Sequence, residues 1–139
     1  MDDSDSLHLR VIGTVRSDLR DPADAPRQGD EGAPPAQLVL APEMRPGLDG
    51  LQVGDELLVL TWLHLGRRDV LRTRPRNDPA RPEQGVFTTR SPDRPNPIGL
   101  HRVRVRALRP DVVEVDGLEA VDGTPVVDLK PVLGPVQER

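Results

Sequence analysis

The sequence contains no cysteine and no tyrosine, and it has one tryptophan and one phenylalanine. Without cysteine the chain can form neither disulfides nor thiolate metal sites, which excludes the usual small secreted scaffolds. With so few aromatic side chains the core must be built from Val, Leu, Ile and Ala, a composition that favours half-buried strands. At 139 residues the chain fits one compact domain.

Long apolar segments are also missing from the sequence. No stretch approaches the roughly 20 apolar residues of a membrane-spanning helix. The N-terminal segment MDDSDSLHLR is acidic and has no apolar run of the kind that targets a chain for export. These features predict a soluble, cytoplasmic protein with no membrane partner.

Charge is distributed unevenly along the chain. The formal net charge is −4, which by itself argues against a nucleic-acid substrate. Between residues 67 and 106, however, eleven arginines stand against four carboxylates, so a basic middle lies between acidic flanks. Arginines can hold a phosphate-bearing ligand through charge and bidentate hydrogen bonds. They can equally be solvated strand faces in a chain whose only lysine is Lys130, and the sequence leaves both interpretations open.

The apolar pattern predicts strands rather than helices. Apolar and polar residues alternate over 7–15, and over 102–107 the valines would face inward and the arginines outward. The apolar run in 54–65 is expected of a strand buried on both faces or nearly so. Further short strands are predicted at 37–40, 112–115 and 125–129, with Pro-rich loops at 17–35 and 74–84. We therefore predict a mainly all-β fold, a small single-domain β-barrel or sandwich of about five to seven strands.

Common catalytic signatures are absent from the sequence. It has no P-loop, no GxGxxG after a strand, no GxSxG and no HExxH. A three-histidine site would need all of His8, His64 and His101, and each lies in a strand pattern beside apolar residues. No metal site is predicted.

Two blocks of the sequence are unusual. GVFTTRSPDRPNPIGL sets Arg90, Arg94 and Asn96 among prolines, which fix backbone torsions and can hold polar side chains in one arrangement. A functional loop is favoured over one that merely crosses a barrel end. In the second block, DGTPVVDLKP, Asp128 and Lys130 lie on the same face of a strand. They could form an internal ion pair or serve catalysis.

These blocks resemble the signature segments of the TrmO, or TsaA-like, family. IGTVRS near the N-terminus resembles the family's opening strand, PRQ at 26–28 its early loop, and GLQVGDELLVLTWLH its central strand. The similarity runs over about 7–131. We therefore expect a TsaA-like β-barrel domain there, between an acidic N-terminal tail at 1–6 and a C-terminal tail at 132–139.

The resemblance implies a β-barrel methyltransferase that works as a homodimer, with S-adenosyl-L-methionine (SAM) bound near the subunit interface. It also implies a substrate, tRNA, methylated on the exocyclic nitrogen of threonylcarbamoyladenosine at position 37. The positions that match family cofactor contacts are Pro26, Arg27, Gln28, His64, Leu65, Arg90, Leu100, Asp116, Gly117, Leu118 and Glu119. Arg27 or Arg90 could pair with the methionine carboxylate, and Asp116 or Glu119 with ribose hydroxyls or the amino group.

Candidate residues for the substrate and for catalysis follow less directly. Methyl transfer is an in-line displacement on a sulfonium carbon, so alignment in a dry pocket can supply most of the acceleration without a protein nucleophile. A base would take the proton of the accepting nitrogen, and Asp128 and His64 are candidates for that role. Candidates for substrate contacts are Arg94, Asn96, Lys130, Arg102, Arg104 and Arg106.

Two alternative functions remain open at this level. Longer bacterial members are expected to carry an additional C-terminal domain, whereas this sequence stops at Arg139. That difference leaves room for a TrmO-like methyltransferase acting on a small molecule or another nucleoside. A non-catalytic SAM-binding module, which kept the barrel and lost turnover, is the second alternative.

Overall fold

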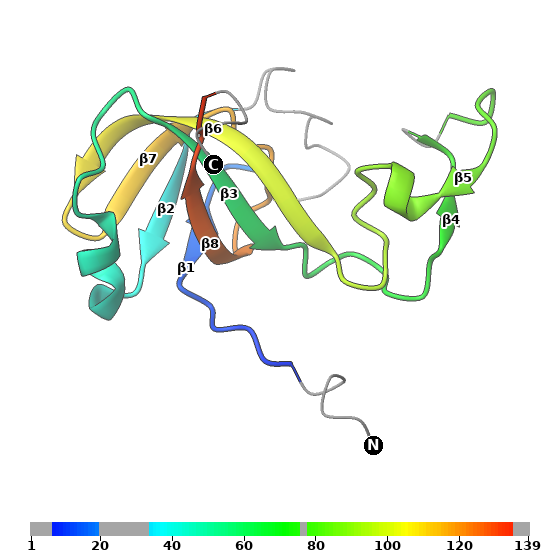
Figure 1. Cartoon of the computed structure of the whole chain (residues 1–139), viewed down its shortest axis with the longest axis horizontal. Helices are drawn as coiled ribbons and strands as arrows, with labels where there is room; N and C mark the ends of the chain where they lie inside the picture. The colour runs from blue at the N-terminus through cyan, green and yellow to red at the C-terminus, as the bar shows by residue number, and fades with distance from the viewer. Residues whose placement is uncertain (1–6, 20–33, 76–77, 135–139) are drawn as a thin grey trace.

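The computed structural model describes residues 7–19, 34–75 and 78–134 (Figure 1). Its main body consists of six strands, β1 (Gly13–Arg16), β2 (Ala36–Leu40), β3 (Glu56–Trp62), β6 (Ile98–Arg109), β7 (Val112–Asp116) and β8 (Pro125–Pro131). Neighbouring strands pair antiparallel in the order β1-β2-β7-β6-β3-β8, and a short β1–β8 pairing closes the sheet into a barrel. The prediction of a small, mainly β fold with five to seven strands is confirmed.

The barrel interior is aliphatic. Inward and outward residues alternate along each strand, and β6 shows this most fully, with Val103 and Val105 buried and the arginines between them exposed. A β-bulge between Val105 and Ala107 bends this long strand around the barrel. The buried cluster consists of Val15, Ala36, Leu38, Leu40, Leu57, Val59, Val103, Val105, Val113, Val115, Leu118, Ala120 and Val126. It contains no aromatic side chain, as the composition predicts.

Two strand predictions were wrong in extent. The strand expected over 7–15 begins only at Gly13, and Leu7, Leu9 and Val11 are 86%, 56% and 52% exposed. Residues 7–11 alternate but have no neighbouring strand to pair with, because backbone pairing ends at Ile12 and the chain after β2 forms a helix. The 54–65 run forms β3, which is buried on one face only, with half-buried residues alternating along the other.

A 3₁₀-helix, η4 (Pro42–Leu48), covers one end of the barrel. Met44, Leu48 and Leu51 pack against the buried cluster from this side. Among the described residues, no helix is long and apolar enough to cross a membrane.

The described residues between β3 and β6, 63–75 and 78–97, project from the barrel in Figure 1, and we call them the arm. It contains the two-stranded pair β4 (Arg72–Thr73) and β5 (Gln84–Gly85), followed by the 3₁₀-helix η6 (Val86–Thr88). Both arm strands are two residues long, so side chains must hold most of this segment together.

Candidate functional site

Antiparallel pairing gathers several functional segments at one end of the barrel, which we call the loop end. β1, β3 and β7 finish there, and β2, β6 and β8 begin there. Residues 19 and 34, which flank the segment 20–33, also lie at this end. The predicted cofactor residues Pro26, Arg27 and Gln28 fall inside that segment and so lie outside the described residues. The helix η4 lies at the opposite end.

The loop after β7, residues 117–124, is held rigidly at the loop end. Gly117 has a φ of +92°, a conformation that glycine adopts without strain, and it turns the chain so that Leu118 is fully buried in the core. On the far side of the loop, the Ser17 amide donates to Asp122 Oδ1 at 3.0 Å, and the Gly123 amide donates to the Val15 carbonyl at 2.8 Å. Glu119 therefore projects from a fixed backbone.

A buried polar chain reaches Glu119 from inside the barrel. Thr61 Oγ1 on β3 lies 2.7 Å from His101 Nε2 on β6, and His101 Nδ1 lies 2.6 Å from Glu119 Oε1. The Thr61 residue is fully buried, and the His101 and Glu119 side chains are 5% and 17% exposed. A Cβ atom at Gly99 would clash with the Thr61 hydroxyl and lie 2.7 Å from His101 Nε2, so glycine is required beside this chain.

Sequence reasoning missed Thr61 and His101 as parts of the site. The available signal was the alternation of β6, which places residue 101 on the inner face with Val103 and Val105. A histidine on such a face must find hydrogen-bond partners. Those partners come from β3 and from the loop after β7, 40 and 18 residues away in sequence, and no local pattern specifies them.

The remaining predicted cofactor residues fall into two groups. Leu100 on β6 neighbours His101, and Asp116, Gly117 and Leu118 lead into Glu119, so the structure brings these five positions to the barrel's loop end. Asp116 forms an exposed ion pair with Arg106 at 3.3 Å.

The other group belongs to the arm. His64 and Leu65 lie in an exposed turn directly after β3, where the arm begins. Arg90 is exposed further along the arm and has no side-chain partner among the described residues. Within the described part of the chain, no hydrogen bond or ion pair joins Arg90 to the loop that carries Glu119.

The proline-rich block holds the arm together. The Arg94 guanidinium donates to the carbonyls of Val86 and Thr89. Arg68 donates to the Pro95 carbonyl at 2.7 Å and to Asn96 Oδ1 at 3.0 Å, and its guanidinium lies 5.1 Å from the centre of the Trp62 ring. The substrate-binding roles of Arg94 and Asn96 stay predictions, and the contacts observed for both side chains are internal.

The predicted substrate arginines on β6 point outward, as expected, and each has a carboxylate partner. Arg102 Nε lies 2.7 Å from Glu56 Oε2, Arg104 lies 3.7 Å from Glu56 Oε1, and Arg106 pairs with Asp116. The hydrogen bond from Arg102 lowers the pKa of Glu56 below its ordinary value, and the charges of Arg102 and Arg104 act in the same direction.

The candidate bases differ in position. Asp128 lies opposite Leu60 in the β3–β8 register and forms a 3.3 Å ion pair with Lys130, so the interpretation of these two residues as an internal pair is confirmed. His64 is exposed in the turn after β3. Their catalytic roles stay predictions. Among the described residues, no three His, Asp or Glu side chains come close enough together to hold a metal ion.

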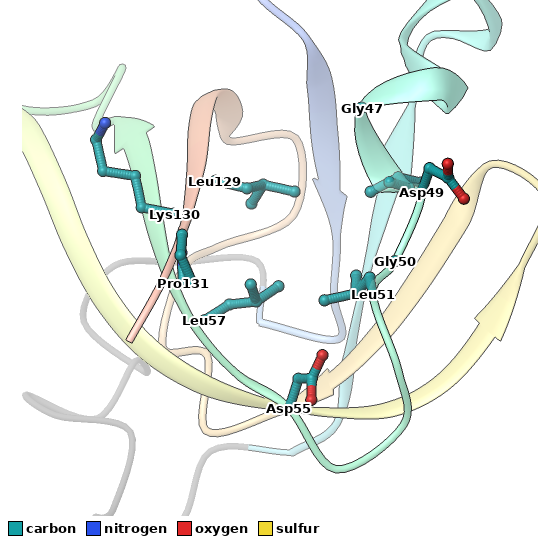
Figure 2. Close-up of a pocket in the computed structure, with 10 residues that line it drawn as sticks. Gly47, Asp49, Gly50, Leu51, Asp55, Leu57, Leu129, Lys130 and Pro131 are labelled. Atoms are coloured by element: carbon teal, nitrogen blue, oxygen red, sulfur yellow. The ribbon is translucent and has the colours of Figure 1, made fainter. Parts of the chain in front are cut away.

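Two cavities lie at opposite ends of the barrel. One, of about 250 Å³, lies between η4 and the start of β3, and Figure 2 shows Leu51, Leu57 and Leu129 around it with Asp55 at its edge. Lys130 also lines it, but no predicted cofactor residue does. The other, of about 270 Å³, is polar and lies at the loop end, lined by Arg16, Ser17, Asp18, Pro35 and Gln37.

The fold and site define a small antiparallel β-barrel protein whose loops present acidic side chains at one end and whose arm presents arginines. The chain belongs to the TrmO family: residues 14–136 match the tRNA-methyltransferase O N-terminal domain.

Relatives and solved structures agree with this assignment. The chain is 42% identical over 125 residues to a "Probable S-adenosyl-L-methionine-binding protein" of Methanothermobacter thermautotrophicus, covering 90% of this chain and 89% of that one. It is 39% identical over 122 residues to an S-adenosyl-L-methionine-binding protein of Archaeoglobus fulgidus, covering 88% and 86%. The crystal structure of TrmO from Pseudomonas aeruginosa superposes with a TM-score of 0.74 at 29% identity. That comparison covers 91% of this chain and 56% of the TrmO chain.

Proposed function

We propose that this protein is a SAM-dependent methyltransferase that acts on tRNA and methylates the exocyclic nitrogen of threonylcarbamoyladenosine at position 37. The observation that carries the proposal is the family match across 14–136, combined with the rigid loop that presents Glu119 at the loop end. The names of the relatives support the cofactor, and the name of the matching domain, tRNA-methyltransferase O, supports the tRNA.

The side chains present suit this cofactor. SAM carries an ammonium group, ribose hydroxyls, a carboxylate and apolar surface, and it supplies an electrophilic methyl group when bound. Glu119 and Asp116 can accept hydrogen bonds from the ammonium group or the hydroxyls, and the exposed Arg90 can pair with the carboxylate. Leu65 and Leu100, 56% and 42% exposed, offer apolar contact. These residues would bind and align the donor, and alignment is the main requirement of the displacement.

The decisive assay supplies labelled SAM and tRNA that either carries or lacks the threonylcarbamoyl group, followed by nucleoside mass spectrometry. We expect methylation of the carrying tRNA alone. Cofactor binding without product on either tRNA would favour the small-molecule or other-nucleoside acceptor. Absence of SAM binding at millimolar concentration, measured by calorimetry, would overturn both methyltransferase proposals.

The outward arginines of β6 are proposed to contact tRNA phosphates by exchanging their exposed carboxylate partners. Exposed ion pairs of this kind are weak, so a phosphate can replace the carboxylate. We expect tRNA binding to fall steeply with salt because each neutralised phosphate releases counterions. The triple substitution of Arg102, Arg104 and Arg106 by Ala should weaken tRNA binding and leave SAM affinity unchanged. Substitution of Arg10 and Arg45, near η4 at the opposite end, is the matched control.

A homodimer is the assembly that best suits the site. The predicted cofactor residues are divided between the barrel and the projecting arm, so the arm of a second copy could complete the site. This stretch of chain, the arm and the start of β6, also carries exposed apolar side chains, with Leu71, Phe87 and Ile98 being 62%, 78% and 44% exposed. Light scattering should therefore show a dimer that Ile98→Asp dissociates. The control Leu133→Asp alters a side chain of similar exposure outside this stretch. A monomer that still binds SAM would contradict the dimer.

A non-catalytic SAM-binding module remains the second candidate, because the relatives of Methanothermobacter thermautotrophicus and Archaeoglobus fulgidus are named for binding rather than for transfer. The two candidates differ in turnover only. SAM binding with no transfer to tRNA or to small nucleoside acceptors would favour the module.

A further inference from the structure

The chain of hydrogen bonds from Thr61 through His101 to Glu119 has a defined direction. A carboxylate only accepts hydrogen bonds, so His101 Nδ1, at 2.6 Å from Glu119 Oε1, must carry a hydrogen. In the neutral ring Nε2 is then the acceptor, and the Thr61 hydroxyl at 2.7 Å donates to it. The three groups therefore fix the tautomer of His101 and the orientation of its ring.

One oxygen of Glu119 stays available to a ligand. Among the described residues, Oε1 has the hydrogen bond to His101, and Oε2 has no partner. No buried side-chain nitrogen or oxygen atom of these residues lacks a partner, so Oε2 must be accessible from outside. A flexible glutamate would have to be ordered when a ligand binds, whereas this carboxylate is oriented beforehand by a buried ring.

We propose that His101 is a positioning residue: held by Thr61, it fixes Glu119 Oε1 so that Oε2 faces a hydrogen-bond donor of the ligand at the loop end. The donor is an ammonium group or a ribose hydroxyl, and the inference rests on the proposed SAM-binding function. Gly99 is part of the same arrangement, because any larger residue there would displace the Thr61 hydroxyl and the His101 imidazole.

The binding test compares two amide substitutions of similar polarity. The amide nitrogen of Asn in His101→Asn lies where Nδ1 lies and can still donate to Glu119, whereas that of Gln in His101→Gln lies where Nε2 lies and cannot. By calorimetry we expect His101→Gln and Glu119→Gln each to weaken SAM binding about tenfold or more, the scale of a lost charge-assisted hydrogen bond. His101→Asn should stay within about threefold of the unsubstituted protein. A role in packing alone predicts a loss for the smaller Asn at least as large as that for Gln, and that result would overturn the inference.

A double-mutant cycle on SAM affinity tests the same inference in a second way. If His101 acts through Glu119, the double variant His101→Gln/Glu119→Gln should bind SAM no more weakly than Glu119→Gln alone. Additive losses would overturn the inference. Thermal melts of each variant confirm that the barrel is folded before affinity is compared.

A third measurement needs no cofactor. Nitrogen-15 NMR of the imidazole rings should show the Nδ1-protonated tautomer for His101, with His8 and His64 as the other two histidine signals. The Nε2-protonated tautomer would overturn the inference. If the unsubstituted protein does not bind SAM, the proposed function fails and the inference fails with it. If it binds SAM and His101→Gln binds equally well, the inference alone fails.

Discussion

The barrel and the arm are parts of one chain that are stabilised in different ways. The barrel buries aliphatic side chains completely, among them Leu38, Val59 and Val113. In the described part of the arm, only Val86 and Pro97 are fully buried, and arginines hold the segment together by donating to backbone carbonyls. The difference shows that arginines of one chain can hold backbone carbonyls in one region and form exposed ion pairs with carboxylates in another.

This difference predicts separate stabilities for the two regions. Apolar burial is cooperative across the whole barrel, whereas the arm depends on a few half-exposed hydrogen bonds that water can replace. Segments of the latter kind open locally without global unfolding. The substitutions below test that separation in order of decreasing effect.

Leu38→Ala should produce the largest loss of stability. Leu38 is fully buried between β1 and β7, and truncation leaves a cavity that a closed barrel cannot readily fill. We expect the free energy of unfolding to fall by about 2–5 kcal/mol, measured by urea denaturation with circular dichroism. Leu7→Ala, at an 86% exposed position, is the matched control and should change it by less than about 0.5 kcal/mol. Equal effects would contradict a core-stabilised barrel.

Arg94→Ala should loosen the arm and leave the barrel nearly intact. It removes a donor to the carbonyls of Val86 and Thr89, and the Thr89 carbonyl then has to be hydrated because Val86 alone keeps other donors, the amide and hydroxyl of Thr89. We expect amide hydrogen exchange in the arm to accelerate about tenfold or more, with little change in barrel amides. Arg81→Ala removes only an exposed 3.8 Å ion pair on the same arm and should accelerate exchange much less. Faster exchange throughout the barrel would show that the two regions unfold together.

The barrel was the more predictable of the two regions. Its strands follow period-two alternation, so the inward valines and outward arginines of β6 could be read directly from the sequence. The failed prediction at 7–12 shows the limit, because alternation specifies a strand only where a neighbour exists to pair with it. Strand pairing is a property of the whole fold and has no local signal.

The candidate site was predictable only in part. The resemblance made Glu119 a candidate, but its hydrogen-bonded neighbours His101 and Thr61 come from β6 and β3, and the sequence connected neither of them with Glu119. The roles of Arg94 and Asn96 depend on carbonyls and side chains that meet only in the folded arm. An arginine between prolines has the same sequence pattern whether its partner is a ligand or a backbone carbonyl.

Glu56→Gln should have the smallest effect, and it tests whether the exposed ion pairs on the outer face of the barrel contribute to its stability. The pKa of Glu56 is lowered, chiefly by the hydrogen bond from Arg102. A carboxyl with a lowered folded-state pKa stabilises the fold above its ordinary pKa, and this contribution disappears as pH falls through the folded-state value. Because the pair is exposed, we expect the melting temperature at neutral pH to drop by less than about 3 °C, and less again in 1 M salt. Melting curves across acidic pH should converge for the two proteins as Glu56 becomes protonated. A large drop in melting temperature at neutral pH that persists in high salt would mean that these outer ion pairs, and not the aliphatic interior alone, stabilise the closed barrel.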